Sequence, residues 1–593
     1  MAPPRALALL PLLAALAAAL AIPVDLPPAA APGAHAPRRL VFLAGDLSEA
    51  DWLAFAAAVV AGGGEPLLLW DAPGHAGQLE RFLRAYAPDR IIPVGDCPNL
   101  PRYRAAAPIA PELRRPGGRP DLLWRELGTA TDRVVVCPAA PRPRLLRAAY
   151  LAGLLRAPLC VGREGPAAAA GLRACLGAAR PREVIAVGGS ATLCKSVPGV
   201  RVSELSDETA LDRAIEQALR GHGPVRTLVV ANPFDDRDGM SNHARFAPWL
   251  ALRRGAAVVW TNPAGTDVEE AVAAARARPY CRGAEHVLLL GDRCALPPRR
   301  RADPLSGTSA HIDTEPLTPA EGGLYRYAVG RIFHPCPETL LLREARQRLF
   351  EQRREAPRAL VASNPGGGLE LLELCSRRSA RELGNAGLRV RGLFGRDVRP
   401  GELRLAMTRA DLFLWEGHSE TLVEKWKFPE WDEPLPPSLV VLQSCTGLEE
   451  ATALPVLDRG AVAVVGSTAR TYSASGGAFA LAFLDAMLYD GRTVGGALRQ
   501  ANNFLLMYAD LKEERLGGRA RMGGANLRAA WTFALWGDPT LRPPRPPEPR
   551  GALPPVRWRV EPGSGAGHTI RAAIPGQTYP VESVGEYRAQ SWA

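Results

Sequence analysis

A regular alternation of short apolar runs with longer amphipathic segments, beginning near Arg38, constrains the fold of this chain more than any other feature. The first three apolar runs read RLVFLAG, EPLLLWDA and RIIPVGD, and a segment long enough for a helix separates each from the next. Strands that are apolar throughout are buried on both faces, and when helices connect them they form mainly parallel sheets. The sequence therefore predicts an α/β fold with a mostly parallel sheet flanked by helices.

The alternation falls into separate blocks, as expected for a chain of 593 residues, which is too long for one hydrophobic core. A new block begins near Val225 and a third near Arg358, and the proline-rich stretch RPPRPPEPR begins at Arg542. Such stretches are extended linkers. We therefore expect N-terminal α/β domains over residues 38–222, a subdomain over 225–350, a second subdomain over 356–543, and a linker with a short tail over 544–593.

The N-terminus has the features of a secretory signal peptide. Arg5 precedes an apolar stretch from Leu7 to Leu20, and the small residues around Ala21 fit a cleavage site. The stretch is short for a membrane span, and no other apolar run reaches 18 residues. We expect residues 1–21 to be removed after Ala21, leaving a mature chain without a transmembrane segment that is secreted or held in the cell envelope. An uncleaved anchor is the alternative.

The net charge of +11 does not indicate a nucleic-acid partner. Only four of the 72 basic residues are lysines, and the arginines are scattered along the chain. A nucleic-acid-binding surface would show a basic stripe with aromatic residues interleaved. We therefore expect no nucleic-acid partner.

Two of the later apolar runs end in a reactive side chain. DLFLWEGH ends at His418, and SLVVLQSC ends at Cys445. Ligands bind at the carboxyl ends of parallel strands, so neighbouring strands would place the imidazole against the thiol. An imidazole can take the thiol proton or protonate a leaving amine, and a helix expected from Leu448 would favour the thiolate. A structural buried cysteine and a solvated histidine are the alternatives.

The neighbourhood of these residues contains an ordered set of motifs: WEGHSET, LQSC, GAVAVVGSTARTYSASGG and WTFALWGDPTL. Together they resemble the gingipain-type cysteine peptidases, which share the caspase fold. Upstream, RRGAAVVWTN, HVLLLGD and YRYAVGRI resemble the smaller α/β subdomain of that family, so the resemblance covers about residues 225–543. It implies a caspase-haemoglobinase-like fold and an endopeptidase acting on protein or peptide substrates.

The resemblance also implies roles for individual residues. His418 and Cys445 would form the catalytic dyad, with Cys445 attacking the scissile carbonyl to give an acyl-enzyme that water hydrolyses. Gly417 would shape the histidine loop, and the backbone at Ser419 and Cys445 would donate to the oxyanion. The candidate walls of the substrate pocket are Tyr472 and Ser473.

The chain departs from the family pattern at two positions. Family members usually have a glycine directly after the histidine, where this chain has Ser419. Some members orient the histidine with a glutamate, and Asn364 holds that place here. The Asn364 carbonyl can accept the imidazole N–H as in Cys-His-Asn arrangements, with capping of the following loop as the alternative. Glu416 is the second candidate orienter, with a solvated loop carboxylate as its alternative.

No cofactor is expected. Calcium is known in relatives, and the acidic loop Phe234–Asn242 is the one candidate, for which a plain polar turn is the alternative. The stretch Thr131–Ala191 also resembles one cell-wall-binding repeat, through AAYLAGLLRAPLCV and PREVIAVGGSATL, although a generic βαβ unit explains it too. Residues 38–222 are therefore expected to be a prodomain or a wall-binding domain, with the cell envelope as a candidate partner.

Two other functions compete with the exported endopeptidase. One is an inactive surface or cell-wall binding protein on a peptidase fold, which Ser419 and Asn364 favour. The other is an intracellular caspase-like signalling peptidase, against which the leader argues.

Overall fold

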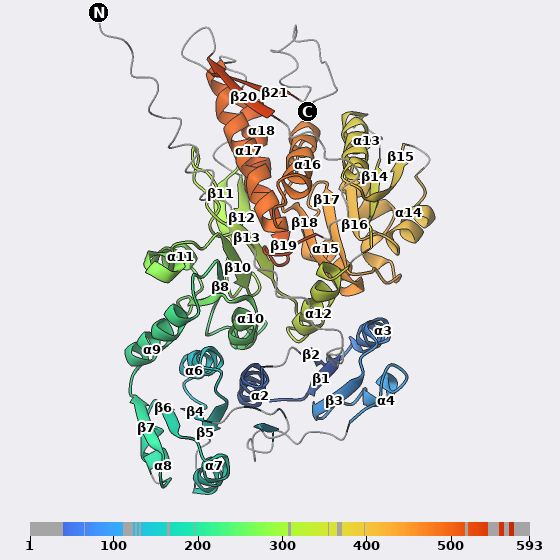
Figure 1. Cartoon of the computed structure of the whole chain (residues 1–593). Coiled ribbons are helices and arrows are strands. Elements are labelled where there is room, and N and C mark those ends of the chain that lie inside the picture. Colours follow the sequence, from blue (N-terminus) through green and yellow to red (C-terminus); the bar gives the residue numbers. More distant parts are fainter. Residues whose placement is uncertain are drawn as a thin grey trace, which may run out of the picture. The chain divides into compact units, whose positions relative to one another are not determined.

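In the computed structural model, helices and strands alternate along most of the chain (Figure 1). The predicted signal segment and most of the predicted tail lie outside the described residues. The structure describes residues 39–63, 66–110, 123–124, 127, 129, 132–162, 166–195, 197–305, 310–353, 355–364, 370–395, 398–515, 520–543, 557–562 and 568–573.

Two small parallel sheets come first in the chain. The first has the order β2-β1-β3, and its elements are β1 (Leu40–Gly45), α2 (Glu49–Ala61), β2 (Leu67–Trp70), α3 (Ala76–Tyr86), β3 (Arg90–Gly95) and α4 (Leu100–Tyr103). The second has the order β5-β4-β6-β7, and its elements are β4 (Arg133–Pro138), α6 (Arg142–Leu154), β5 (Leu159–Gly162), α7 (Pro166–Ala179), β6 (Glu183–Val187), α8 (Ala191–Lys195), β7 (Arg201–Leu205) and α9 (Glu208–Gly221). The alternation of apolar runs and helices thus predicts both sheets.

One ten-stranded sheet spans the two predicted subdomains, in the order β15-β14-β16-β17-β18-β19-β13-β10-β8-β9. Its strands are β8 (Thr227–Ala231), β9 (Ala257–Trp260), β10 (His286–Leu290), β13 (Ala328–Ile332), β14 (Arg358–Ser363), β15 (Arg389–Phe394), β16 (Leu412–Glu416), β17 (Ser438–Gln443), β18 (Ala461–Ser467) and β19 (Phe533–Trp536). Neighbours are parallel except β18 and β19, which are antiparallel. The mostly parallel sheet is confirmed, but its two halves run in opposite directions.

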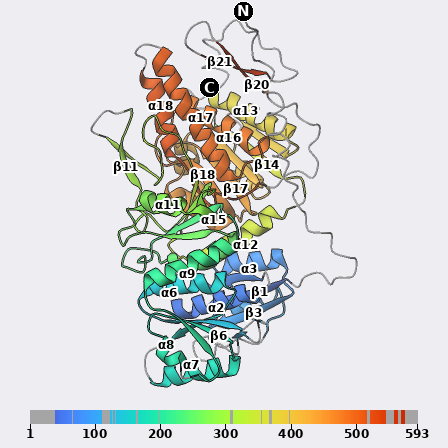
Figure 2. The same cartoon turned by 60° about the vertical axis from the view of Figure 1, so that its left-hand side comes forward.

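Helices cover both faces of the half that carries the two reactive strand ends. Along β16, Leu412 and Leu414 pack with apolar side chains of α16 (Ser473–Leu488) and α17 (Val494–Arg515). Phe413 and Trp415 pack with those of α14 (Pro400–Met407) and α15 (Glu450–Arg459). Side chains alternate between the faces of a strand, so a continuous apolar run is what a strand between two helical layers requires. Helices α16 and α17 lie side by side (Figure 1 and Figure 2).

The remaining helices and hairpins complete this part of the chain. The helices are α10 (Ala247–Arg254), α11 (Val268–Ala277), α12 (Thr339–Glu351), α13 (Glu370–Asn385), α14 (Pro400–Met407), α15 (Glu450–Arg459), α16 (Ser473–Leu488), α17 (Val494–Arg515) and α18 (Ala520–Thr532). Within the described residues, none of the helices combines the length and apolarity that crossing a bilayer requires. Two antiparallel hairpins pair β11 (Arg299–Ala302) with β12 (His311–Thr314), and β20 (Arg557–Pro562) with β21 (His568–Ala573).

Candidate active site

His418 and Cys445 lie at the same level on two adjacent strand ends. Strands β16 and β17 are parallel, with Glu416 opposite Gln443, and each reactive residue comes two positions beyond its member of this pair. The Gly417 N–H donates to the Gln443 carbonyl at 3.2 Å, so the pairing continues up to the residue before His418. Neighbouring strands are about 4.8 Å apart. The structure therefore brings the imidazole-bearing and thiol-bearing residues together at the carboxyl edge of the sheet.

The turn after Cys445 has an unusual backbone conformation. Thr446 has a φ of 52°, in the left-handed region that β-branched residues rarely adopt. The turn is held by two hydrogen bonds, from the Thr446 N–H to the Ala469 carbonyl at 3.2 Å and from the Leu448 N–H to the Ser467 carbonyl at 3.0 Å. Strained conformations of this kind persist only where the surroundings enforce them, and they cluster at functional sites.

The thiol itself is half-buried. Cys445 Sγ lies 3.6 Å from the Thr471 carbonyl oxygen, in the segment between β18 and α16. The next helix, α15, begins at Glu450, so the prediction of a helix start near Leu448 was wrong by two residues. Residues 446–449 form the intervening turn, and helix-terminus effects fade within about one turn. The argument that a helix N-terminus favours the Cys445 thiolate therefore loses its basis.

The loop after β16 is packed closely against the end of β14. A Cβ atom at Gly417 would lie 3.0 Å from the Trp415 ring and 3.2 Å from Asn364 Cβ, closer than ordinary van der Waals contact. Beyond His418 the chain forms a π-helical turn, Glu420–Lys425, and Asn364 Nδ2 donates to Thr421 Oγ1 at 2.6 Å. Short π-helical turns are rare in proteins overall, but those that exist often lie at functional sites. Glycine at position 417 is thus what allows the histidine loop to approach β14.

Ser419 also belongs to this loop. It precedes the π-helical turn with φ −62° and ψ −41°, which are helical values that need no glycine. The serine found where the family usually has glycine therefore fits the local backbone without strain.

A buried carboxylate, Glu416, lies at the end of β16, two residues before His418. Glu416 is fully buried, and it accepts hydrogen bonds from Ser376 Oγ at 2.8 Å and Ser379 Oγ at 3.2 Å, both on α13. Burial raises the pKa of Glu416 to about 7, and the two serine hydroxyls only partly oppose this. The alternative of a solvated loop carboxylate was wrong. The two serines were not singled out from the sequence, because i,i+3 hydroxyls on a helix carry no distinctive signal.

The two candidate pocket residues come next in the chain after the residue whose carbonyl contacts the thiol. Tyr472 and Ser473 directly follow Thr471, whose carbonyl contacts Cys445, and the Tyr472 side chain is 53% exposed. Helix α16 begins at Ser473 and packs against the end of β17, because a Cβ at Gly476 would lie 2.3 Å from Gln443 Nε2. The start of α16 is therefore fixed relative to the strand that carries the cysteine.

The acidic loop Phe234–Asn242 lies elsewhere. It follows β8, which runs opposite to β16 and β17, so this loop lies at the other edge of the sheet. Its Asp235 pairs with the Arg142 guanidinium at 3.0 Å. Among the residues that the structure describes, no three His, Cys, Asp or Glu side chains are grouped as metal ligands.

The C-terminal part of the chain matches a known family. Residues 441–544 fit the family model of peptidase family C25, and this segment contains Cys445 together with β18 and β19. The resemblance to gingipain-type cysteine peptidases is thereby confirmed for this segment, and it supports a cysteine-type peptidase, a hydrolase that acts on proteins. No curated protein sequence matches the chain.

Several solved structures are similar to the chain. The Arg-specific cysteine proteinase gingipain R is 17% identical over 54% of this chain and 78% of that chain, with a TM-score of 0.40. The complex of pro- and mature domains of RgpB from Porphyromonas gingivalis is 16% identical over 54% and 79%, with a TM-score of 0.38. A structure described only as a protease is 14% identical over 59% and 85%, with a TM-score of 0.42.

Proposed function

Because residues 441–544 match peptidase family C25, we propose that this chain is an exported cysteine endopeptidase whose catalytic dyad is His418 and Cys445. The observation that carries the proposal is the parallel register of β16 and β17, in which both residues come two positions beyond the Glu416–Gln443 pair. Export is inferred from the N-terminal leader alone, and a location in the cell envelope is part of the same proposal.

The reaction follows from the chemistry of the two side chains. His418 removes the proton from the Cys445 thiol, and the thiolate sulfur attacks the carbonyl carbon of the scissile peptide bond. The protonated imidazole then gives its proton to the leaving amine, which leaves an acyl-enzyme on Cys445. Water, deprotonated by His418, hydrolyses this thioester. Backbone N–H groups of Cys445 and Ser419 are the proposed donors to the oxyanion that forms in each half of the reaction.

Of the two candidate orienters, the contacts favour Asn364. Its Nδ2 donates to Thr421 Oγ1 at 2.6 Å, which fixes the Asn364 side chain to the turn that follows His418, and an amide oxygen can accept an imidazole N–H. Asn364 directly follows Ser363, the β14 partner of Glu416, so it lies beside Gly417 and next to the histidine loop. Glu416 is less suitable, because both its carboxylate oxygens accept hydroxyls of α13.

Cleavage of a fluorogenic peptide library tests the proposal. We expect the purified mature protein to cut a subset of the peptides, and we expect Cys445→Ala and His418→Ala each to abolish cutting. Cys294→Ala is the matched control, because Cys294 is an exposed cysteine in the loop after β10, and it should leave the activity unchanged. Absence of cleavage by the wild type, before and after limited proteolysis, would instead favour the inactive surface or cell-wall binding protein.

A further inference from the structure

The antiparallel β18–β19 pair divides the large sheet into two halves whose strands end on opposite edges. Strands β14 to β18 end at the edge with His418 and Cys445. Strands β8, β9, β10, β13 and β19 are parallel to one another and end at the other edge. In open α/β sheets ligands bind where parallel strands end, so this second edge would be a second site if it were uncovered.

The N-terminal module, defined here as residues 40–222, packs against the helices and loop of the second half. Trp52 of α2 donates its indole N–H to the Arg245 carbonyl at 3.1 Å, and its ring lies 5.1 Å from that of Phe246. Tyr150 of α6 donates its hydroxyl to the Ala256 carbonyl at 2.6 Å, and all these contacts are buried. One apolar core therefore runs from α2 and α6 into β8, α10 and β10.

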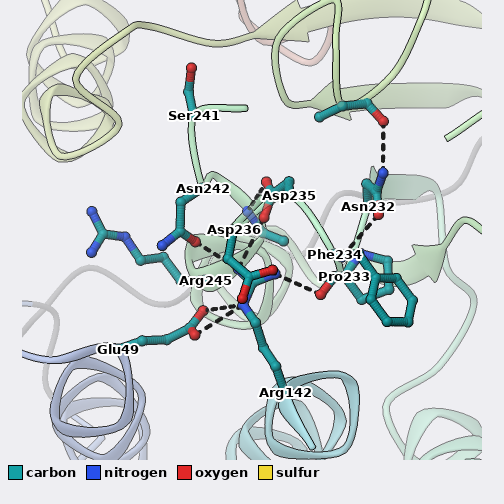
Figure 3. A network of polar contacts seen from close by, with 12 residues as sticks. Glu49, Arg142, Asn232, Pro233, Phe234, Asp235, Asp236, Ser241, Asn242 and Arg245 are labelled. Atoms are coloured by element: carbon teal, nitrogen blue, oxygen red, sulfur yellow. Dashed lines mark hydrogen bonds and ion pairs between the residues drawn. The ribbon is translucent and has the colours of Figure 1, made fainter. Parts of the chain in front are cut away.

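Arg142 holds the module to the loop that follows β8 (Figure 3). Its Nε contacts both carboxylate oxygens of Glu49 at 2.9 Å, and its Nη2 contacts Asp235 Oδ1 at 3.0 Å and Asn242 Oδ1 at 2.6 Å. Its Nη1 donates to the Pro233 carbonyl at 2.6 Å. The acidic loop that the sequence suggested for calcium thus surrounds a guanidinium supplied by the module.

Burying the Arg142 guanidinium would destabilise the fold unless this network of hydrogen bonds and ion pairs is formed. It is the first residue of α6, where the helix dipole disfavours a positive charge. Its side chain is only 11% exposed, and Asp235 is fully buried. Removing one partner of a buried ion pair leaves the other charge unpaired, which is strongly destabilising. The module and the β8 loop therefore depend on each other.

We propose that the N-terminal module is a permanent part of the folded peptidase, which supports the strand ends opposite the dyad, and not an inhibitory segment that must leave before Cys445 can react. The inference rests on the proposed function only in taking Cys445 as the nucleophile. Its basis is the location of the Arg142 network and the shared core at the second half of the sheet, whereas His418 and Cys445 lie at the other edge.

Cutting the chain between module and peptidase tests the proposal directly. A recognition sequence for a site-specific protease is inserted between Gly223 and Pro224, in the largely exposed connection between α9 and β8. After cleavage we expect both fragments to co-elute in size-exclusion chromatography, and the rate of Cys445 alkylation by iodoacetamide to change less than two-fold. Fragments that separate, with alkylation accelerated ten-fold or more, would overturn the proposal. If Cys445 reacts no faster than an ordinary thiol both before and after cleavage, the proposed function is contradicted. Co-elution of the two fragments would still show whether the module stays bound.

Substitution of Arg142 gives an independent test in the uncut chain. We expect Arg142→Met to lower the midpoint of thermal unfolding by about 4 °C, because it leaves the buried carboxylates unpaired. Arg142→Lys should lower it by less, because lysine keeps the positive charge but lacks the planar guanidinium with its several N–H donors. The matched control is Arg182→Met, whose side chain is 87% exposed and which should leave the midpoint unchanged. Neither Arg142 variant should speed up Cys445 alkylation below its unfolding temperature. Faster alkylation in Arg142→Met would mean that the module restrains the dyad, and would contradict the proposal.

Discussion

At the scale of single residues, Glu416 differs most from what its sequence context suggests. A carboxylate two positions before a loop histidine is usually solvated, yet Glu416 ends β16 and is fully buried. The serines that bond it, Ser376 and Ser379, come 40 and 37 residues earlier in the sequence. Local sequence patterns cannot reveal such a contact. His418 and Cys445 were easier to locate, because each directly follows an apolar strand.

The burial of Glu416 predicts a pH-dependent stability effect. Its pKa rises from 4.5 to about 7 on folding, so between these values the native state binds a proton that the unfolded state releases. Stability therefore falls as pH rises through this window. We expect Glu416→Gln to raise the free energy of unfolding at pH 8 by at most about 3 kcal/mol, and to change it little at pH 4.

Urea unfolding at the two pH values measures this effect, in a Cys445→Ala background that prevents self-digestion. The control is Glu430→Gln, because the Glu430 side chain is 70% exposed. A loss of stability in Glu416→Gln at pH 8 would show that the ionised carboxylate is stabilising, against this account.

Asn364 offers a second prediction at the residue scale. If its carbonyl orients His418, Asn364→Ala should lower kcat by about ten-fold or more, equivalent to about 1.4 kcal/mol, with little change in KM. Asn364→Asp should restore part of the activity and shift the pH profile to higher pH, since a carboxylate favours the protonated imidazole. Steady-state kinetics across pH would check both variants, and an unshifted profile in Asn364→Asp would leave Asn364 with a structural role only.

At the scale of elements, the fit between β14, β16 and the π-helical turn depends on Gly417. A methyl group there would meet the Trp415 ring at 3.0 Å and Asn364 Cβ at 3.2 Å, so the histidine loop would have to move. We expect Gly417→Ala to slow peptide cleavage by ten-fold or more, because a displacement of about 1 Å can cost 10²-fold in rate. The control is Gly401→Ala in α14, where nothing lies within 4 Å of the added atom and activity should stay unchanged. Full activity in Gly417→Ala would show that the loop tolerates the shift.

The elements themselves were largely predictable, since strands buried on both faces are continuously apolar and the intervening helices are long. The start of α15 was not, because hydrogen bonds to β18 and its following loop extend the turn after Cys445. The π-helical turn Glu420–Lys425 was not predicted either, because one turn is too short to establish a sequence period.

At the scale of the whole molecule, one continuous sheet joins the two subdomains that the sequence predicts. The joining strand is β19, which comes near the end of the described catalytic region and is inserted between β13 and β18. Its motif, WTFALWGDPTL, resembles the family pattern, but nothing in the motif indicates this pairing. Pairing between strands that are far apart in the sequence produces no periodic pattern of apolar residues. The opposite directions of the two halves could therefore be seen only in the structure.

The central claim, that His418 activates Cys445, is tested most directly by comparing two thiols in one protein. Mass spectrometry after timed iodoacetamide treatment at pH 6.5 gives the alkylation rates of half-buried Cys445 and exposed Cys294. A thiolate reacts far faster than a thiol, so we predict that Cys445 reacts at least ten-fold faster than Cys294 and that His418→Ala removes the difference. Equal rates for the two cysteines, unaffected by His418→Ala, would contradict the dyad.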